Sequence, residues 1–227
     1  DTDAPGASLY VPFELGPGES KTIRLLMTWY VPDSNLKYGQ DSAEPDDEIC
    51  DDPSCSCKDP YYKPWYSGKF SSVREVAAYW KTNYNDLYNK SELFSNSFYK
   101  STLPPEVIEA IAANLTILKS PTVLRQPDGR LWNWEGCSDN SGCCAGSCTH
   151  VWNYAQAIPH LFPKLERTLR ETEFFPSQDS EGHQTFRSAL PIRPVATTFH
   201  SASDGQLGGI MKVHRDWRIS GDSEWLK

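Results

Sequence analysis

No apolar run in the sequence approaches the roughly 20 residues that a membrane-spanning helix needs. No cluster of Lys and Arg could follow a phosphate backbone, and the formal net charge is −8. Because nucleic-acid binding depends on clustered cations, we predict neither a nucleic-acid partner nor an integral membrane segment. The chain opens at Asp1 without a signal-like segment, which leaves a secreted, periplasmic or cytoplasmic location open.

An even number of cysteines is also lacking, so the seven thiols cannot all pair with one another. The cysteines fall into two groups, Cys50, Cys55 and Cys57, and then Cys137, Cys143, Cys144 and Cys148. The second group does not match the ligand spacing of a standard zinc finger. A buried thiol or a disulfide is the better interpretation, with oxidised and reduced states equally open.

Residues 8–31 are expected to form β structure. Segments 8–15 and 22–31 are rich in β-branched and aromatic side chains, and the Gly-Pro-Gly-Glu sequence at 16–19 is typical of a turn. Because two strands are not stable alone, we expect this hairpin to be the end of an N-terminal β-sandwich-like domain.

Residues 32–66 are polar and irregular, and segment 41–60 within them has six Asp, two Glu and three Cys among its prolines. The simplest interpretation is a solvated linker or insertion loop. A structural calcium or other cation is the alternative, because clustered carboxylates suit calcium and Cys-x-Cys suits a softer metal. No other metal or cofactor is expected.

From residue 71 onward the apolar spacing becomes helical. Helices are predicted from 71 to 87, from 104 to 121, over 149–160, after Pro163 and around 204–217, with a break at 220–222 and a new start at 223. The residues expected on their apolar faces include Trp80 and Tyr84, then Leu165, Leu169 and Phe174, and finally Leu207, Ile210 and Met211.

This order predicts a mainly α chain with a small β part, divided into 1–31, 32–66 and 67–227. The helical part would belong to an all-α toroid or solenoid. Because the chain stops where a helix begins, we expect a fragment. The exposed helix faces would then meet either the missing remainder of the polypeptide or a homodimer partner.

The residues most suggestive of chemistry lie in segment 131–154, where Glu135 stands between Trp134 and Gly136. Aromatic faces stack on sugar rings while polar groups fix the hydroxyls, and glycosidases use carboxylates on either side of the bond they cleave. We interpret Glu135 as a candidate catalytic carboxylate and Trp134 as part of a site for a carbohydrate or glycoside substrate. A solvated surface glutamate is the plain alternative.

Thr149, His150 and Asn153 follow in what is predicted to be the start of a helix. They are candidates for substrate binding. They would equally serve to cap the helix or to form hydrogen bonds with polar groups in a core. A nucleophilic pair of Cys148 and His150 is disfavoured, because residues two apart on a helix point to different faces.

His200, Asp204 and Gln206 form a second polar group. Asp204 directly precedes a helical period, so it is a natural N-cap residue. A site for sugar hydroxyls, shared with His200 and Gln206, is the alternative interpretation.

Three stretches of the sequence resemble glycoside hydrolase family 116, the β-glucosidase family that includes non-lysosomal glucosylceramidase. They are PTVLRQPDGRLWNWEGC, GCCAGSCTHVWNYAQAIPHLFPKLERTLRETEF and FHSASDGQLGGIMKVHRDWRISGDSEWLK. The resemblance covers 8–30 and 66–227 and is densest over 104–174 and 200–227. It implies a β-sandwich-like N-terminal domain, the first helices of an (α/α)6 barrel over 67–227, and a retaining mechanism.

The resemblance also implies roles for single residues. The family nucleophile is the Glu of a Trp/Leu-Glu-Gly motif, which is Glu135 here, and a sugar-binding acid of the family falls near Thr149 and His150. The acid/base Asp lies downstream of this chain, so we expect the chain alone to have negligible hydrolytic activity.

One departure from the family leaves the sugar open. Family members carry a sugar-binding His-Asp pair that segment 186–191 lacks, and His183, Arg187 and His200 are candidates to replace it. Two other functions remain open: an inverting (α/α)6 hydrolase or lyase, and a carbohydrate-binding or scaffold module without chemistry.

Overall fold

The computed structural model of the chain describes residues 8–36, 38, 63–119, 123–133, 147–194 and 199–227. As predicted, it is mainly helical with two small antiparallel sheets. The helices are α1 (Val73–Tyr99), α2 (Pro105–Leu115), α3 (Ala157–Leu161), α4 (Pro163–Phe174), α5 (Ser203–Ser220) and α6 (Ser223–Leu226). The 3-10 helices among these residues are η2 (Trp65–Gly68), η3 (Thr116–Lys119) and η4 (Val151–Tyr154). The strands are β1 (Val123–Arg125), β2 (Leu131–Asn133), β3 (Ser147–Cys148) and β4 (Arg187–Ser188).

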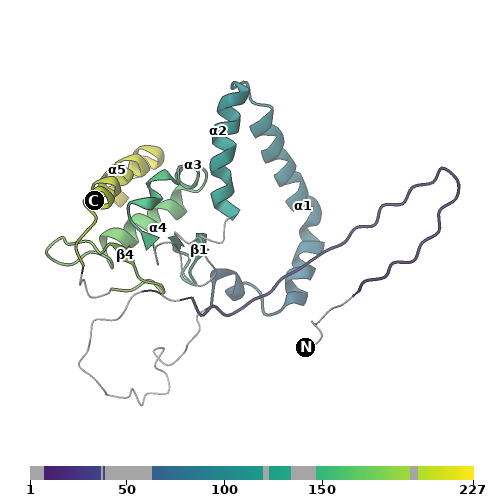
Figure 1. Cartoon of the computed structure of the whole chain (residues 1–227), viewed down its shortest axis with the longest axis horizontal. Helices are drawn as coiled ribbons and strands as arrows, with labels where there is room; N and C mark the ends of the chain where they lie inside the picture. The colour runs from purple at the N-terminus through teal and green to yellow at the C-terminus, as the bar shows by residue number, and fades with distance from the viewer. Residues whose placement is uncertain (1–7, 37, 39–62, 120–122, 134–146, 195–198) are drawn as a thin grey trace, which may run out of the picture.

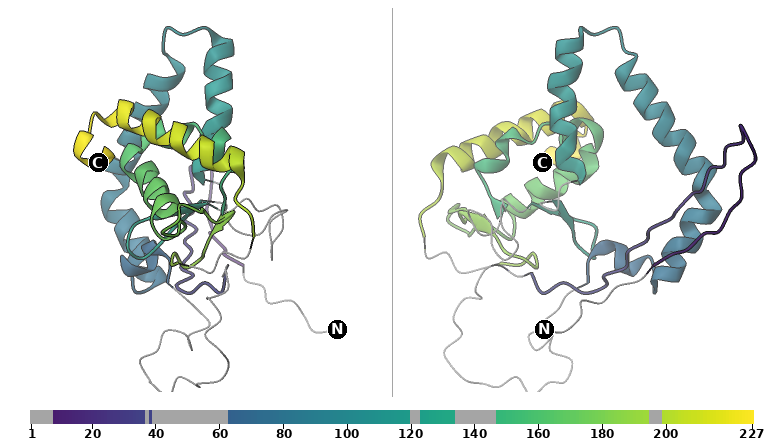
Figure 2. Two further views of the ribbon diagram at one scale, coloured as in Figure 1. Left: turned by 90° about the vertical axis from the view of Figure 1, so that its left-hand side faces the viewer. Right: turned by 45° about the vertical axis from the view of Figure 1, so that its right-hand side comes forward.

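Helices α1 and α2 run antiparallel and diverge from the turn that joins them, while α3, α4 and α5 gather with the strands beyond α2 (Figures 1 and 2). α1 begins at a capping arrangement, in which Ser72 Oγ accepts from Glu75 N and the Glu75 carboxylate accepts from Ser71 N. α2 and α4 both begin with a proline, whose missing N–H has no partner to lose in the first turn. Within the described residues, no helix is long and apolar enough to cross a membrane.

The β hairpin predicted over 8–31 is not formed. Its turn is present, since Glu19 N donates to Gly16 O at 3.1 Å, but segments 8–15 and 22–31 are extended and contain no strand (Figure 1). Large side chains along them, such as Met27 and Trp29, are exposed. Without a third strand or an apolar face to pack on, a two-stranded ribbon gains too little to order its ladder.

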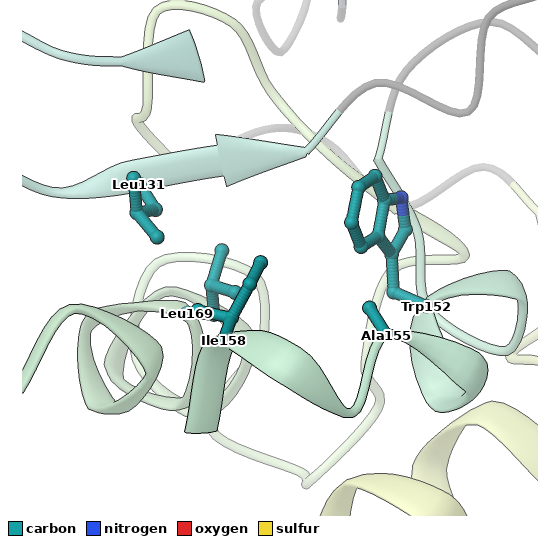
Figure 3. Packing of buried hydrophobic residues seen from close by; sticks show 5 residues of the cluster. All are labelled: Leu131, Trp152, Ala155, Ile158 and Leu169. Carbon is teal, nitrogen blue, oxygen red and sulfur yellow. The ribbon is translucent and has the colours of Figure 1, made fainter. Parts of the chain in front are cut away.

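The core lies on both sides of the β1–β2 hairpin. Leu131 of β2 faces a cluster with Trp152, Ala155, Ile158 and Leu169, in which its side chain lies over Ile158 and Leu169 (Figure 3). The next residue, Trp132, points to the other face of the strand. There it packs in a second cluster with Leu190, Leu36, Tyr38, Leu124 and Ile192.

The hairpin itself is fixed by its turn. β1 and β2 pair in the register Val123 with Asn133, and Gly129 closes the turn with φ +94°, a conformation that glycine adopts without strain. Because β2 ends at Asn133, this turn sets the position of the residue that precedes segment 134–146.

The single helix predicted over 149–160 is wrong. The structure instead has η4 and then α3, separated by Ala155 with ψ 74°. A continuous helix would need Pro159 to donate a hydrogen bond to the carbonyl of Ala155, and proline has no N–H. Restarting at Ala157 places Pro159 in a first turn, where it is tolerated.

Three predicted apolar faces are not buried. No residue of α1 or α2 is buried, and Trp80 of α1 lies against Tyr84 of the same helix, with ring centroids 4.7 Å apart. On α5, Leu207, Ile210 and Met211 are exposed. α5 instead turns a face with Gly205, Gly209, Lys212 and Asp216 toward the interior, so its buried side carries glycines and charges. The fourth helix agrees with the prediction, with Leu169 buried and Leu165 packed on the core.

Candidate functional site

Trp134 and Glu135 belong to segment 134–146, which lies outside the described residues, so the candidate catalytic carboxylate stays a prediction. The structure describes the strands on either side of this segment. β2 leads into it from Trp132 and Asn133, which are buried, and β3 continues from it at Ser147. The other predicted members of the site follow β3.

Thr149 and His150 form the turn after β3 and meet the N-terminal end of α5. The backbone N–H of Thr149 donates to Phe186 O at 3.3 Å, and its hydroxyl lies 3.4 Å from the same oxygen. His150 Nδ1 lies 3.4 Å from the carboxylate oxygens of Asp204. The two polar groups identified in the sequence therefore adjoin in space.

The N-cap role predicted for Asp204 is wrong. The N-cap of α5 is Ala202, without a side-chain hydrogen bond, and Asp204 lies in the first helical turn. A carboxylate there is favoured by the positive end of the helix dipole. Its side chain is thus left to orient the half-buried imidazole of His150.

Two glycines bring the backbone of α5 against this turn. A Cβ at Gly205 would lie 2.3 Å from Thr149 Oγ1, and a Cβ at Gly208 would lie 2.5 Å from Asn153 Nδ2. Only the absence of both side chains allows the helix to approach so closely. Asn153 is held from its own side as well, since its N–H donates to His150 O at 3.3 Å.

An aromatic group covers the same place. The ring of Phe186 has edge-on contacts with His150, Phe199 and His200, at centroid distances of 5.3, 5.7 and 6.1 Å. The Arg187 guanidinium lies 4.9 Å from the Phe186 centroid. Phe199 and His200 are exposed, so rings, imidazoles and a carboxylate share one accessible surface.

The remaining predicted residues are placed differently. The amide nitrogen of Gln206 donates to Gly182 O at 3.0 Å, so this group ties α5 to the preceding loop. His183 lies in that loop, with its Nδ1 3.9 Å from Asp179. Of the three candidates to replace the family's His-Asp pair, Arg187 and His200 join the aromatic group through Phe186, and His183 has its contact with Asp179.

Behind the site, α4 and α5 pack through buried charges. Three acids and three bases form this network: Glu166, Arg170, Glu173, Lys212, Arg215 and Asp216. Glu166 accepts from Arg215 Nη2 at 2.7 Å and lies 3.5 Å from Arg170 Nη1. The charges balance, which is what a buried ionic network needs to avoid an uncompensated ion.

Burial has the largest influence on the pKa of two members of the network. It raises the pKa of the Glu166 carboxyl, against the opposing attraction of Arg170 and Arg215. It lowers the pKa of Lys212, against the attraction of the Glu173 carboxylate. Both shifts mean that desolvation of the charged form outweighs the ion pairs, so the network fixes the position of α5 at an energetic cost.

Neither cysteine chemistry nor a metal centre is evident in the described part of the chain. Cys148 is fully buried in β3, which disfavours it as a nucleophile because reactive thiols are accessible. The described residues include no group of three His, Cys, Asp or Glu that could hold a metal ion. The acidic insertion for which a cation was considered lies outside them.

Sequence reasoning missed Phe186, Phe199, Gly205 and Gly208 as parts of this site. The two phenylalanines stand in a polar loop, and exposed aromatics in such a loop are a usable signal for binding. The glycines stand three apart near the start of a helix, a spacing that indicates a close contact on one face.

A comparison with known protein families finds a match to the N-terminal part of the chain. Residues 1–87 match the family model described as beta-glucosidase 2, glycosyl-hydrolase family 116 N-term. The match ends inside α1, before the residues of the site. No curated protein matches the chain.

Proposed function

Because the match over residues 1–87 supports the assignment of the chain to glycoside hydrolase family 116, we propose that it is part of a retaining, exo-acting β-glucosidase of the glucosylceramidase type. Residues 67–227 supply the first helices of an (α/α)6 barrel in this proposal. The exposed apolar faces of α1 and α5 support it, since further helices of such a barrel would cover them.

In the proposed mechanism Glu135 attacks the anomeric carbon and forms a glycosyl-enzyme. A second carboxylic acid, in the remainder of the protein, protonates the leaving oxygen and then activates water. In retaining enzymes the two carboxyl groups stand about 5–5.5 Å apart, and inverting enzymes need a wider gap to admit the water.

The main support is the convergence of His150, Asp204, Phe186, Phe199 and His200 beside the strand that continues from segment 134–146. Aromatic faces and rigid polar groups are what a sugar site requires. The His150–Asp204 pair can accept and donate hydrogen bonds to sugar hydroxyls, while the exposed ring of Phe199 offers a stacking surface.

The Glu135→Gln variant tests the mechanism in the protein that contains this chain. We expect kcat on an aryl β-glucoside to fall by more than about 10³-fold, the scale on which loss of a nucleophile acts. Intact mass after incubation with a 2-deoxy-2-fluoro-glucosyl fluoride should show one adduct on the Glu135 peptide, and none in the variant. Glu181→Gln, an exposed acid in a loop, is the control and should keep both activity and adduct.

Other outcomes of this experiment point to the rival functions. Turnover with inverted product and no adduct would indicate an inverting hydrolase. Saturable binding of glucosides without any turnover would indicate a carbohydrate-binding module. Either result would contradict the retaining mechanism.

The exposed ring of Phe199 gives a second prediction. Phe199→Ala should lower kcat/KM for glucosides about three- to tenfold, because a stacking surface is lost. The unfolding transition should be unchanged, since the side chain is 57% exposed. Phe175→Ala removes the same side chain from a position that is 73% exposed at the end of α4, and its kcat/KM should equal that of the wild type. Equal losses in both variants would contradict a role in binding.

A further inference from the structure

A hollow lies along the C-terminal half of α5, where α3 approaches it. It has a volume of about 390 Å³ and is lined by His160, His214, Arg215, Arg218 and Ile219. At a rise of about 1.5 Å per residue, Arg218 stands roughly 20 Å along α5 from Asp204. This basic cleft is therefore a different place from the surface around His150.

The cleft has one fixed cation and three further basic groups. Arg215 is held by Glu166 at 2.7 Å, by Asp216 at 2.8 Å and by the Gln156 side chain at 3.1 Å, so its guanidinium is positioned before any ligand arrives. Arg218, His160 and His214 form no ion pair with any residue that the structure describes. Among the residues that the structure describes, no acidic side chain lines the hollow.

The carbonyl of Trp217 at the end of α5 is not bound by these basic groups. Cations are often found at a helix C-terminus because they bind its last carbonyls. Here Trp217 O accepts instead from Gly221 N at 2.7 Å and from Ser220 Oγ at 3.3 Å. The Trp217 carbonyl is thus satisfied by Gly221 and Ser220, without Arg218, His160 or His214.

We propose that this basic cleft binds a phosphate-bearing small molecule, with the phosphate against Arg218 and the two imidazoles and the remainder along Ile219. Guanidinium groups match phosphate oxygens in geometry and charge. The volume of the hollow falls in the range of small-molecule sites, about 300–1,000 Å³. A lipid surface fits less well, because the site is concave.

The five histidines of the chain allow a direct test. The ring C–H signals in a ¹H–¹³C NMR spectrum are followed while inorganic phosphate, and separately phenyl phosphate, replaces chloride at constant pH and ionic strength. We expect saturable shifts of the His160 and His214 signals only, with phenyl phosphate binding more tightly because of Ile219. Parallel shifts of all five signals, or none at saturating phosphate, would overturn the proposal.

Arg218→Gln supplies the matched variant. We expect it to weaken phosphate binding about tenfold, the loss of one charged hydrogen-bond donor. Arg74→Gln, an exposed arginine of α1, should leave the affinity unchanged, and urea unfolding should confirm that both variants are folded. Equal affinity of Arg218→Gln and the wild type would contradict the assignment, as would binding to anionic vesicles without binding to either phosphate.

Discussion

Gly205→Ala is expected to destabilise the protein by about 1–3 kcal/mol, the usual range for forcing an atom into a packed interface. The new Cβ would lie 2.3 Å from Thr149 Oγ1, 3.0 Å from Thr149 Cβ and 3.1 Å from His150 N. One of these atoms is backbone and another is anchored at the start of its side chain. Relief therefore requires α5 to move away, which would also separate Asp204 from His150.

Two neighbouring glycines give graded controls for this substitution. At Gly208 the obstructing atoms belong to the amide of Asn153, the far end of a side chain that can rotate, so Gly208→Ala should cost less. At Gly209 the closest atom is a ring carbon of Phe174 at 3.4 Å, an ordinary contact. There the better helix propensity of alanine, about 1 kcal/mol, should make Gly209→Ala neutral or stabilising.

Urea unfolding of the three variants checks this order. The destabilisation should decrease from Gly205 to Gly208 to Gly209. Equal effects at all three positions would show that the packing of α5 on Thr149 and Asn153 is not what limits the substitution.

Glu166→Gln is expected to lower the free energy of unfolding by about 1–3 kcal/mol, the usual cost of leaving buried donors without an acceptor, because relief of the desolvation that raises the pKa of Glu166 offsets part of the lost ion pairs. The variant would leave the buried Arg170 and the Arg215 guanidinium without the carboxylate that they share. Adding Arg215→Gln should recover part of the loss by restoring the charge balance, and the double-mutant cycle measures how much. Asp86→Asn breaks a surface ion pair with Lys90 and should have no measurable effect.

The pH dependence of the same variant has a defined sign. Burial raises the pKa of Glu166, so in the window just above the ordinary value of about 4.3 the folded protein holds more protons than the unfolded chain. The stability of the wild type should therefore fall, relative to Glu166→Gln, as pH rises through this window. A difference that grows in the opposite direction would contradict the burial of an acid whose pKa is raised.

The apolar periodicity of the sequence predicted where the helices lie, but it did not predict which of their faces are buried. The spacing of apolar residues predicted α1, α2, α4 and α5, and Pro105, Pro163 and Gly221 marked ends that the structure confirms. The same spacing placed Ile210 and Met211 inward, although both are exposed. Lys212 faces the interior against Glu173 of α4, and Asp216 is paired with Arg215 of α5 itself. No local pattern reveals the partner on α4.

The sequence identified several residues of the site, but it did not predict how they are arranged. Thr149, His150, His200 and Asp204 are identifiable as a polar set suited to sugars, and the structure brings them together around Phe186. The Thr149–Phe186 and His150–Asp204 contacts join residues 37 and 54 positions apart, which requires the register of β3 with β4 and the approach of α5. Both depend on tertiary packing, which a single sequence does not state.

The paired backbone bonds between Tyr38 and Leu190, both 2.8 Å long, bear on where the chain can be divided. Tyr38 belongs to the stretch matched by the N-terminal family model, whereas Leu190 and Trp132 belong to the region that carries the site. A truncation beginning at residue 67 would strip Leu36 and Tyr38 from this cluster and open Trp132 to water. Contacts of the described residues thus cross the boundary predicted at residue 67, and we expect a chain divided there to be less stable than the chain that keeps both parts.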